Sequence, residues 1–142
     1  LPENAVMWFR GHTNTHDSHT AEIASGAIDV TSYPNVTELC LAADVLVTDY
    51  SSIMFDFTVA GKPLLILAPD IEVYERERGF YFRDAVPAPV VHDQSELELW
   101  LQRLDELPQM FKDRYRAWSD TFHSWEQGTA SERVVDTFFG RD

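Results

Sequence analysis

The chain has 142 residues, 44% of them hydrophobic, which is enough for one globular domain with its own core. Its net charge of −13 argues against non-specific binding to nucleic acid or to anionic lipid. The single cysteine, Cys40, excludes an internal disulfide framework and fits a reducing compartment, and the longest apolar run, 63–69, is too short to cross a bilayer.

Short apolar runs alternate with helical patterns over the first two-thirds of the chain. Strands are predicted at 5–9, 28–31, 45–48 and 64–67, and the first of these is expected to be buried. One helix is predicted to start near Asn35, which is followed three residues later by Glu38 as in a capping box. A second is predicted over 51–60, ended by Gly61-Lys62-Pro63. Apolar strands that alternate with helices indicate an α/β fold, with a Rossmann-like parallel sheet flanked by helices.

The last third of the sequence predicts a helical C-terminal tail. Apolar residues follow helical spacing over 97–107, and the aromatic residues between Phe111 and Trp125 form a second stripe at steps of three and four. A short closing helix is predicted around 134–139. Because the aromatic stripe is regular, we interpret it as a packing surface and not as a cofactor site.

The segment 43–57 carries the densest signal for chemistry, because a strand runs directly into a polar turn and then into a helix. Ligands of parallel sheets gather at the carboxyl ends of strands, and a helix N-terminus offers free N–H groups to a phosphate. Ser51 and Ser52 would add hydroxyl donors there. From 1 to 61 the only Lys or Arg is Arg10, so a phosphate site in that part depends on amides, hydroxyls and helix dipoles. The alternative is that Asp49 and the two serines only cap the helix, and the pattern alone leaves both interpretations open.

The run 49–57, followed by Gly61-Lys62-Pro63, resembles the signature of the CDP-glycerol glycerophosphotransferase family. Further pieces match in the same order, at 38–44, 70–74, 78–82 and 128–133. The resemblance therefore spans roughly the whole chain, which a chance motif does not do. It implies that residues 1–142 are a single nucleotide-binding domain, the C-terminal half of a two-domain GT-B fold. The start at Leu1-Pro2, without an initiator Met, also predicts a piece of a longer protein.

The family implies a transferase of bacterial teichoic acid biosynthesis. Its donor would be CDP-glycerol, its acceptor a teichoic-acid-type chain, and its further partner the N-terminal domain of the same polypeptide. The expected location is cytoplasmic, with the full-length protein peripheral at the inner face of the cell membrane. We expect no cofactor, no metal, no transmembrane segment and no nucleic-acid partner, and we expect the isolated fragment to be inactive.

The resemblance also assigns site residues. Ser51 and Ser52 would bind the pyrophosphate of CDP, and Asp56 would either orient Ser52, meet the ribose or stabilise the helix. Ser131 and Arg133 lie at a predicted helix start, where they would line the phosphate site or cap the helix.

The stretch Arg10-Gly11-His12 resembles the family's Arg-x-His motif at the end of a strand. Arg10 would then bind phosphate, and His12 would be catalytic, as a proton donor or charge stabiliser. Thr13 stands where the family often has proline, and Ala88 interrupts the usual Pro-Gly-Pro, so both local turns depart from the pattern. The spacing of His12 with His16 and His19 also suits a metal site on a helix, although the surrounding residues favour a loop.

Two other functions remain open from sequence alone. One is a sugar transferase of the same fold that uses a nucleotide sugar. The other is a non-catalytic interaction module that docks through its aromatic tail. The sequence also leaves open whether the transferred unit is glycerol phosphate or a related polyol phosphate.

Overall fold

The computed structural model describes residues 5–11, 26–79, 84–125 and 127–140. Backbone contacts divide the chain into two compact units, which we call the N-terminal unit (Leu1–Leu39) and the C-terminal unit (Cys40–Asp142). Among the described residues, no helix is long and apolar enough to cross a membrane.

The N-terminal unit contains a small parallel sheet. Strand β1 (Trp8–Phe9) pairs with β2 (Ile28–Asp29), and Trp8 lies opposite Ile28. The strand predicted over 5–9 is present at two of its residues, but its expected burial is wrong, because Trp8 remains 42% exposed. A sheet of two strands offers each strand one neighbour, so apolar side chains on it stay partly open to solvent.

Helix α2 (Val36–Ala42) begins where the sequence predicts. The Asn35 side chain accepts hydrogen bonds from the N–H groups of Thr37 (3.1 Å) and Glu38 (3.4 Å), and donates one to the Glu38 carboxylate (2.9 Å). These bonds satisfy two of the donors that a helix start leaves free. The predicted helix start at Asn35 is thereby confirmed, although Glu38 pairs with the Asn35 side-chain amide and not with its backbone N–H as in a capping box.

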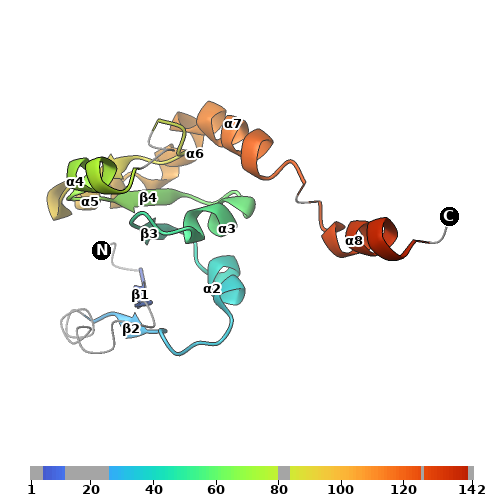
Figure 1. Ribbon diagram of the computed structural model, residues 1–142. Coiled ribbons are helices and arrows are strands. Elements are labelled where there is room, and N and C mark those ends of the chain that lie inside the picture. The colour runs from blue at the N-terminus through green and yellow to red at the C-terminus, as the bar shows by residue number, and fades with distance from the viewer. Residues whose placement is uncertain (1–4, 12–25, 80–83, 126, 141–142) are drawn as a thin grey trace. The chain divides into compact units, whose positions relative to one another are not determined.

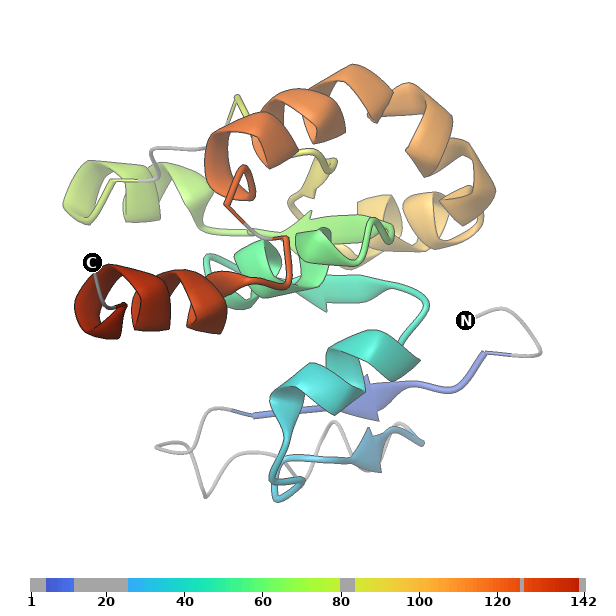
Figure 2. The ribbon, with the colours of Figure 1, turned by 90° about the vertical axis from the view of Figure 1, so that its right-hand side faces the viewer.

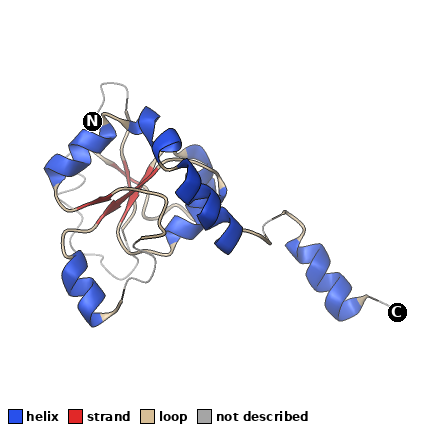
Figure 3. Ribbon diagram, turned by 90° about the horizontal axis from the view of Figure 1, so that it is seen from above, coloured by secondary structure: helices blue, strands red, loops and turns tan. Residues whose placement is uncertain are grey.

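The C-terminal unit is built on a three-stranded parallel sheet in the order β3-β4-β5, of which Figure 1 labels β3 and β4. Its strands are β3 (Leu46–Thr48), β4 (Leu64–Leu67) and β5 (Val90–Val91). Leu64, Leu65 and Ile66 are fully buried because β4 is the central strand. The parallel α/β prediction is confirmed, with strands at the centre of this unit and helices around them (Figure 3).

Helix α3 (Ile53–Val59) follows β3, and α4 (Ile71–Glu77) follows β4. The remaining elements are α5 (Gln94–Leu101), the short 3-10 helix η1 (Leu104–Glu106), α6 (Leu107–Met110), α7 (Lys112–Phe122) and α8 (Ala130–Phe139). The helical prediction for the last third is confirmed, but the first stripe breaks into α5, η1 and α6. Pro108 explains the last break, since proline is tolerated in the first turn of a helix and not in its interior.

Helix α7 lies beside α3, as the side view shows (Figure 2). The core between them and the sheet includes Met54, Ile66 and Trp118, with Phe55 and Phe122 packed against it. The aromatic stripe predicted for 111–125 is therefore a packing surface in its central part.

Candidate functional site

Two loops meet at the carboxyl edge of the β3-β4-β5 sheet. The turn Asp49–Ser52 follows β3, and Asp70 follows β4. Because the strands are parallel and in register, with Thr48 opposite Ile66, their carboxyl ends lie at one edge. This is the edge at which open α/β sheets bind ligands.

Backbone hydrogen bonds give the Asp49–Ser52 turn its shape. The Asp49 carboxylate accepts from the Ser51 N–H at 3.0 Å, and the Ser51 hydroxyl accepts from the Ile53 N–H at 3.4 Å. Asp49 and Ser51 thus do part of what the capping interpretation assigned to them. Ser52 is the N-cap residue, but its side chain makes no capping bond. Within the described structure its exposed hydroxyl has no hydrogen-bond partner, so this turn leaves it free for a ligand.

Tyr50, inside the same turn, joins it to the loop after β4. Its hydroxyl donates to the Asp70 carboxylate at 2.7 Å, and its ring stacks on Tyr74 of α4 with centroids 3.7 Å apart. Burial, and then the bond to Asp70, raise the pKa of the Tyr50 hydroxyl, so it remains a donor at neutral pH. Sequence analysis did not find this cluster. The available signal was a tyrosine between two polar turn residues, together with an aspartate and a tyrosine four residues apart after the next strand.

Asp56 lies in the first turn of α3 and is exposed. It makes no hydrogen bond to Ser52, although the two residues are one turn apart. A carboxylate in this place interacts favourably with the positive end of the helix dipole. Its stabilising role is therefore the one that the geometry supports.

Arg10 is engaged with the backbone of the N-terminal unit. Its Nη1 donates to the carbonyl of Val30 at 3.1 Å and to that of Tyr33 at 2.8 Å. The side chain is exposed, and these two bonds orient the guanidinium at the end of the small sheet. His12, His16 and His19 lie outside the described residues.

The two predicted site residues on α8 have different surroundings. Thr129 is the N-cap of α8, so Ser131 does not cap this helix. Ser131 lines a shallow surface hollow together with Glu132 and Asp136. Arg133 donates from Nη2 to the carbonyl of Trp125 at 2.7 Å, and its guanidinium lies 5.1 Å from the centroid of that ring. Substrate contacts for this pair remain a prediction.

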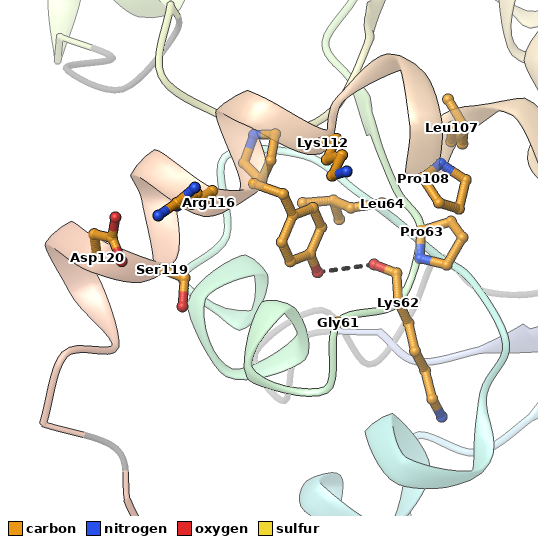
Figure 4. Close-up of a pocket in the computed structure, with 12 residues that line it drawn as sticks. Gly61, Lys62, Pro63, Leu64, Leu107, Pro108, Lys112, Arg116, Ser119 and Asp120 are labelled. Atoms are coloured by element: carbon orange, nitrogen blue, oxygen red, sulfur yellow. Dashed lines mark hydrogen bonds between the residues drawn. The ribbon is translucent and has the colours of Figure 1, made fainter.

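A cavity of about 350 Å³ lies at the opposite edge of the sheet, where β4 begins (Figure 4). Its wall is formed by Gly61–Leu64 and by residues of α6 and α7, and the Tyr115 hydroxyl donates across it to the carbonyl of Lys62 at 2.9 Å. The Lys62 ammonium donates to the carbonyls of Leu41 (2.5 Å) and Ala43 (2.7 Å) at the end of α2. The lysine of the Gly-Lys-Pro motif is thus a C-cap for α2, a role that suits a cation.

These features define a parallel α/β domain of the GT-B class, and known proteins share both its fold and its sequence. A solved structure of the wall teichoic acid polymerase TagF, a variant soaked with CDPG, superposes with a TM-score of 0.80 at 34% identity. The match covers 93% of this chain and 34% of that one. A teichoic acid glycerol-phosphate transferase of Staphylococcus aureus is 39% identical over 78% of this chain and 29% of its own length.

A teichoic acid poly(glycerol phosphate) polymerase of Staphylococcus epidermidis is 38% identical over 78% of this chain and 16% of its own length. The chain thus spans less than a third of the length of these two relatives. The family model for CDP-glycerol:poly(glycerophosphate) glycerophosphotransferases matches residues 1–140. The chain belongs to this family, as its motifs predict.

Proposed function

We propose that this chain is the donor-binding domain of an enzyme that transfers glycerol phosphate from CDP-glycerol to a teichoic-acid-type acceptor. The observation that carries the proposal is the match to one family over 1–140. Likeness in sequence and fold to a TagF variant soaked with CDPG supports it. The acceptor site would lie in an N-terminal domain of the same polypeptide, and the complete enzyme would work at the inner face of the cell membrane.

The carboxyl edge of the β3-β4-β5 sheet is the proposed place of the donor. The free hydroxyl of Ser52 and the amides at the start of α3 would bind the pyrophosphate, with Ser51 as a second hydroxyl. This fits the low number of basic residues in the first half of the chain, because backbone N–H groups and hydroxyls can donate hydrogen bonds to phosphate in place of cationic side chains. The Tyr50–Asp70 bond would hold the turn in a fixed conformation.

The reaction would be attack of an acceptor hydroxyl oxygen on the β-phosphorus of CDP-glycerol. A bond forms between that oxygen and phosphorus, and the bond from phosphorus to the bridging oxygen breaks, so that CMP leaves with the bridging oxygen. The proton of the acceptor hydroxyl is released to solvent. Catalysis would depend on positioning and on stabilising the charge on the phosphate oxygens. Arg10 and His12 are the proposed groups for this, with His12 as proton donor or charge stabiliser.

Calorimetric titration of the chain with CDP and with UDP tests the proposal. We expect CDP to bind more tightly than UDP. Equal affinities would favour the nucleotide-sugar transferase, and no affinity for either nucleotide would favour the interaction module.

Changing both Ser51 and Ser52 to alanine should weaken CDP binding by about 1–3 kcal/mol, since hydrogen bonds to a charged group are lost. The melting temperature should fall only slightly, because both side chains are exposed. Ser124→Ala, an exposed serine after α7, is the control and should change neither quantity. Unchanged CDP affinity in the double variant, with a large drop in melting temperature, would leave helix capping as the role of the two serines.

A further inference from the structure

A buried hydrogen bond joins α7 to α3. Trp118 of α7 is 1% exposed and Thr58 of α3 is 2% exposed. The indole Nε1–H of Trp118 donates to the Thr58 hydroxyl oxygen at 2.9 Å. The indole ring also stacks on Phe55 of α3, with ring centroids 4.8 Å apart.

Two more side chains of the α7 segment contact the backbone of the α3 segment. The Tyr115 hydroxyl lies 3.3 Å from the Thr58 carbonyl oxygen and 2.9 Å from that of Lys62. His123 Nε2 lies 3.1 Å from the Phe55 carbonyl oxygen. A carbonyl oxygen only accepts, so Nε2 carries the hydrogen in this contact. All three side chains therefore donate to α3 or to the segment directly after it.

Thr58 explains why α3 needs a partner of this kind. Its hydroxyl donates to the Met54 carbonyl one turn back, at 2.8 Å. Such a bond inside a helix tends to bend it, and a buried hydroxyl oxygen without a donor is unfavourable. The indole N–H of Trp118 completes the hydrogen bonding of this oxygen. The last turn of α3 is thus held by contacts from α7.

We infer that Trp118 and His123 are positioning residues for the donor site, and that they act through α3 on the Asp49–Ser52 turn. The inference rests on the proposed function. Helix α3 has seven residues, or about 10 Å of length, so a tilt at its last turn moves its first turn as well. The α7 donors hold the far end, while Ser51 and Ser52 lie at the near end. Neither Trp118 nor His123 is expected to touch the nucleotide.

Trp118→Phe removes the indole N–H and keeps an aromatic ring in the core. We expect the apparent affinity for CDP to fall about three- to tenfold, because a smaller fraction of molecules holds the turn in its binding position. Thr58→Ser, which keeps the hydroxyl, should bind CDP nearly as the unchanged chain does.

Thr58→Val removes the acceptor. In that background Trp118→Phe should cause no further loss, because the N–H has no hydroxyl to bind. An equal loss in both backgrounds would overturn the inference, since the effect would then not pass through this hydrogen bond.

Leu107→Ala is the control for lost stability. Leu107 is buried in α6 and lies outside the core cluster of α3 and Trp118. It should lower the melting temperature and leave CDP affinity unchanged. If it weakens CDP binding as much as Trp118→Phe does, a general loss of stability accounts for the result and the inference fails.

His123→Ala tests the same route without a change in the buried rings. It should also weaken CDP binding, and His123→Gln should restore it, because the glutamine amide can donate to the Phe55 carbonyl. Normal affinity in both Trp118→Phe and His123→Ala would overturn the inference. If the unchanged chain binds no CDP, the proposed function itself fails, and the two failures are thereby distinguished.

Discussion

Helices α7 and α8 carry the same kind of sequence pattern and have different surroundings. Both show apolar residues at steps of three and four. In α7 the pattern leads to Trp118, which is almost completely buried, whereas Phe138 and Phe139 of α8 are 74% and 77% exposed. An apolar stripe therefore predicts a helix and its apolar face, but does not identify what packs against that face.

The two helices differ in the hydrogen-bond donors that their apolar faces carry. The face of α7 that meets α3 combines apolar rings with three N–H or O–H donors, and α3 presents matching acceptors. Burial of such groups is favourable only when they are paired, so these bonds specify one arrangement of the two helices. In α8 the residues of the apolar face are Val134, Val135, Phe138 and Phe139, which have no polar atoms in their side chains. Among the described residues, this face of α8 therefore has no donor that would specify a partner as the donors of α7 do.

The largest loss of stability is expected for Trp118, at the centre of the contact between α7 and α3. Trp118→Ala should lower the free energy of unfolding by about 3–5 kcal/mol, because it opens a cavity among Phe55, Met54 and Phe122. Phe138→Ala should change it by less than about 0.5 kcal/mol, because the ring is already in solvent. Urea unfolding of the two variants measures both values. A similar loss in both would show that the face of α8 is covered in solution.

Sequence analysis could predict most of the fold, because the strongest signals are local. The strands at 45–48 and 64–67, the helix after Ser51 and the helix start at Asn35 each follow from a few neighbouring residues. Strand β5 was not predicted. Val90-Val91 is too short to show the alternation of apolar and polar residues that predicts a strand. Its place in the sheet depends on pairing with Ile66 and Leu67, which no local pattern encodes.

The candidate site was predictable in part for the same reason. The turn that contains Ser51 and Ser52 follows from the strand and helix that flank it. The Tyr50–Asp70 bond and the Trp118–Thr58 bond join residues 20 and 60 positions apart, so they depend on the completed fold. Lys62 was predicted only as part of the segment that ends the helix after Ser51. Its actual partners are backbone carbonyls, and side-chain patterns do not show these.

A smaller effect concerns Tyr115, whose hydroxyl is another of the α7 donors. Tyr115→Phe should cost about 1 kcal/mol at pH 8, the usual net value of a lost hydrogen bond. Burial raises the pKa of Tyr115 to about 12. A tyrosine with a raised pKa contributes its full stability below the unfolded value of about 10, and loses it as pH rises through the folded value. The difference between the unchanged chain and Tyr115→Phe should therefore shrink between pH 10 and 12.

Denaturant unfolding at intervals from pH 8 to 11.5 tests this expectation. Tyr50 titrates in both proteins, so its contribution cancels in the difference. If the difference in unfolding free energy between the two proteins stays constant over this range, Tyr115 ionises equally well in the folded and the unfolded chain. Its hydroxyl would then not be held in the α7–α3 contact.

The smallest expected effect on stability concerns the start of α8. Arg133→Met removes a guanidinium that lies over Trp125, a ring that is 71% exposed. A cation–π contact at an exposed site contributes about 0.5–1 kcal/mol, and water can replace the exposed hydrogen bond from Arg133 to the Trp125 carbonyl, so the loss in unfolding free energy should stay near this value. Arg103→Met is the control, since Arg103 also lies 5.1 Å from an aromatic centroid, that of Trp100, and also makes exposed hydrogen bonds, to the Glu106 carboxylate. The two variants should have similar stability but differ in CDP titration.

If Arg133 binds the donor phosphates, as predicted from the sequence, only its replacement weakens CDP binding, by about 1.5–3 kcal/mol for a charged hydrogen bond. Equal CDP affinity in both variants would remove Arg133 from the donor site and leave it as the residue that ties α8 to the backbone of Trp125.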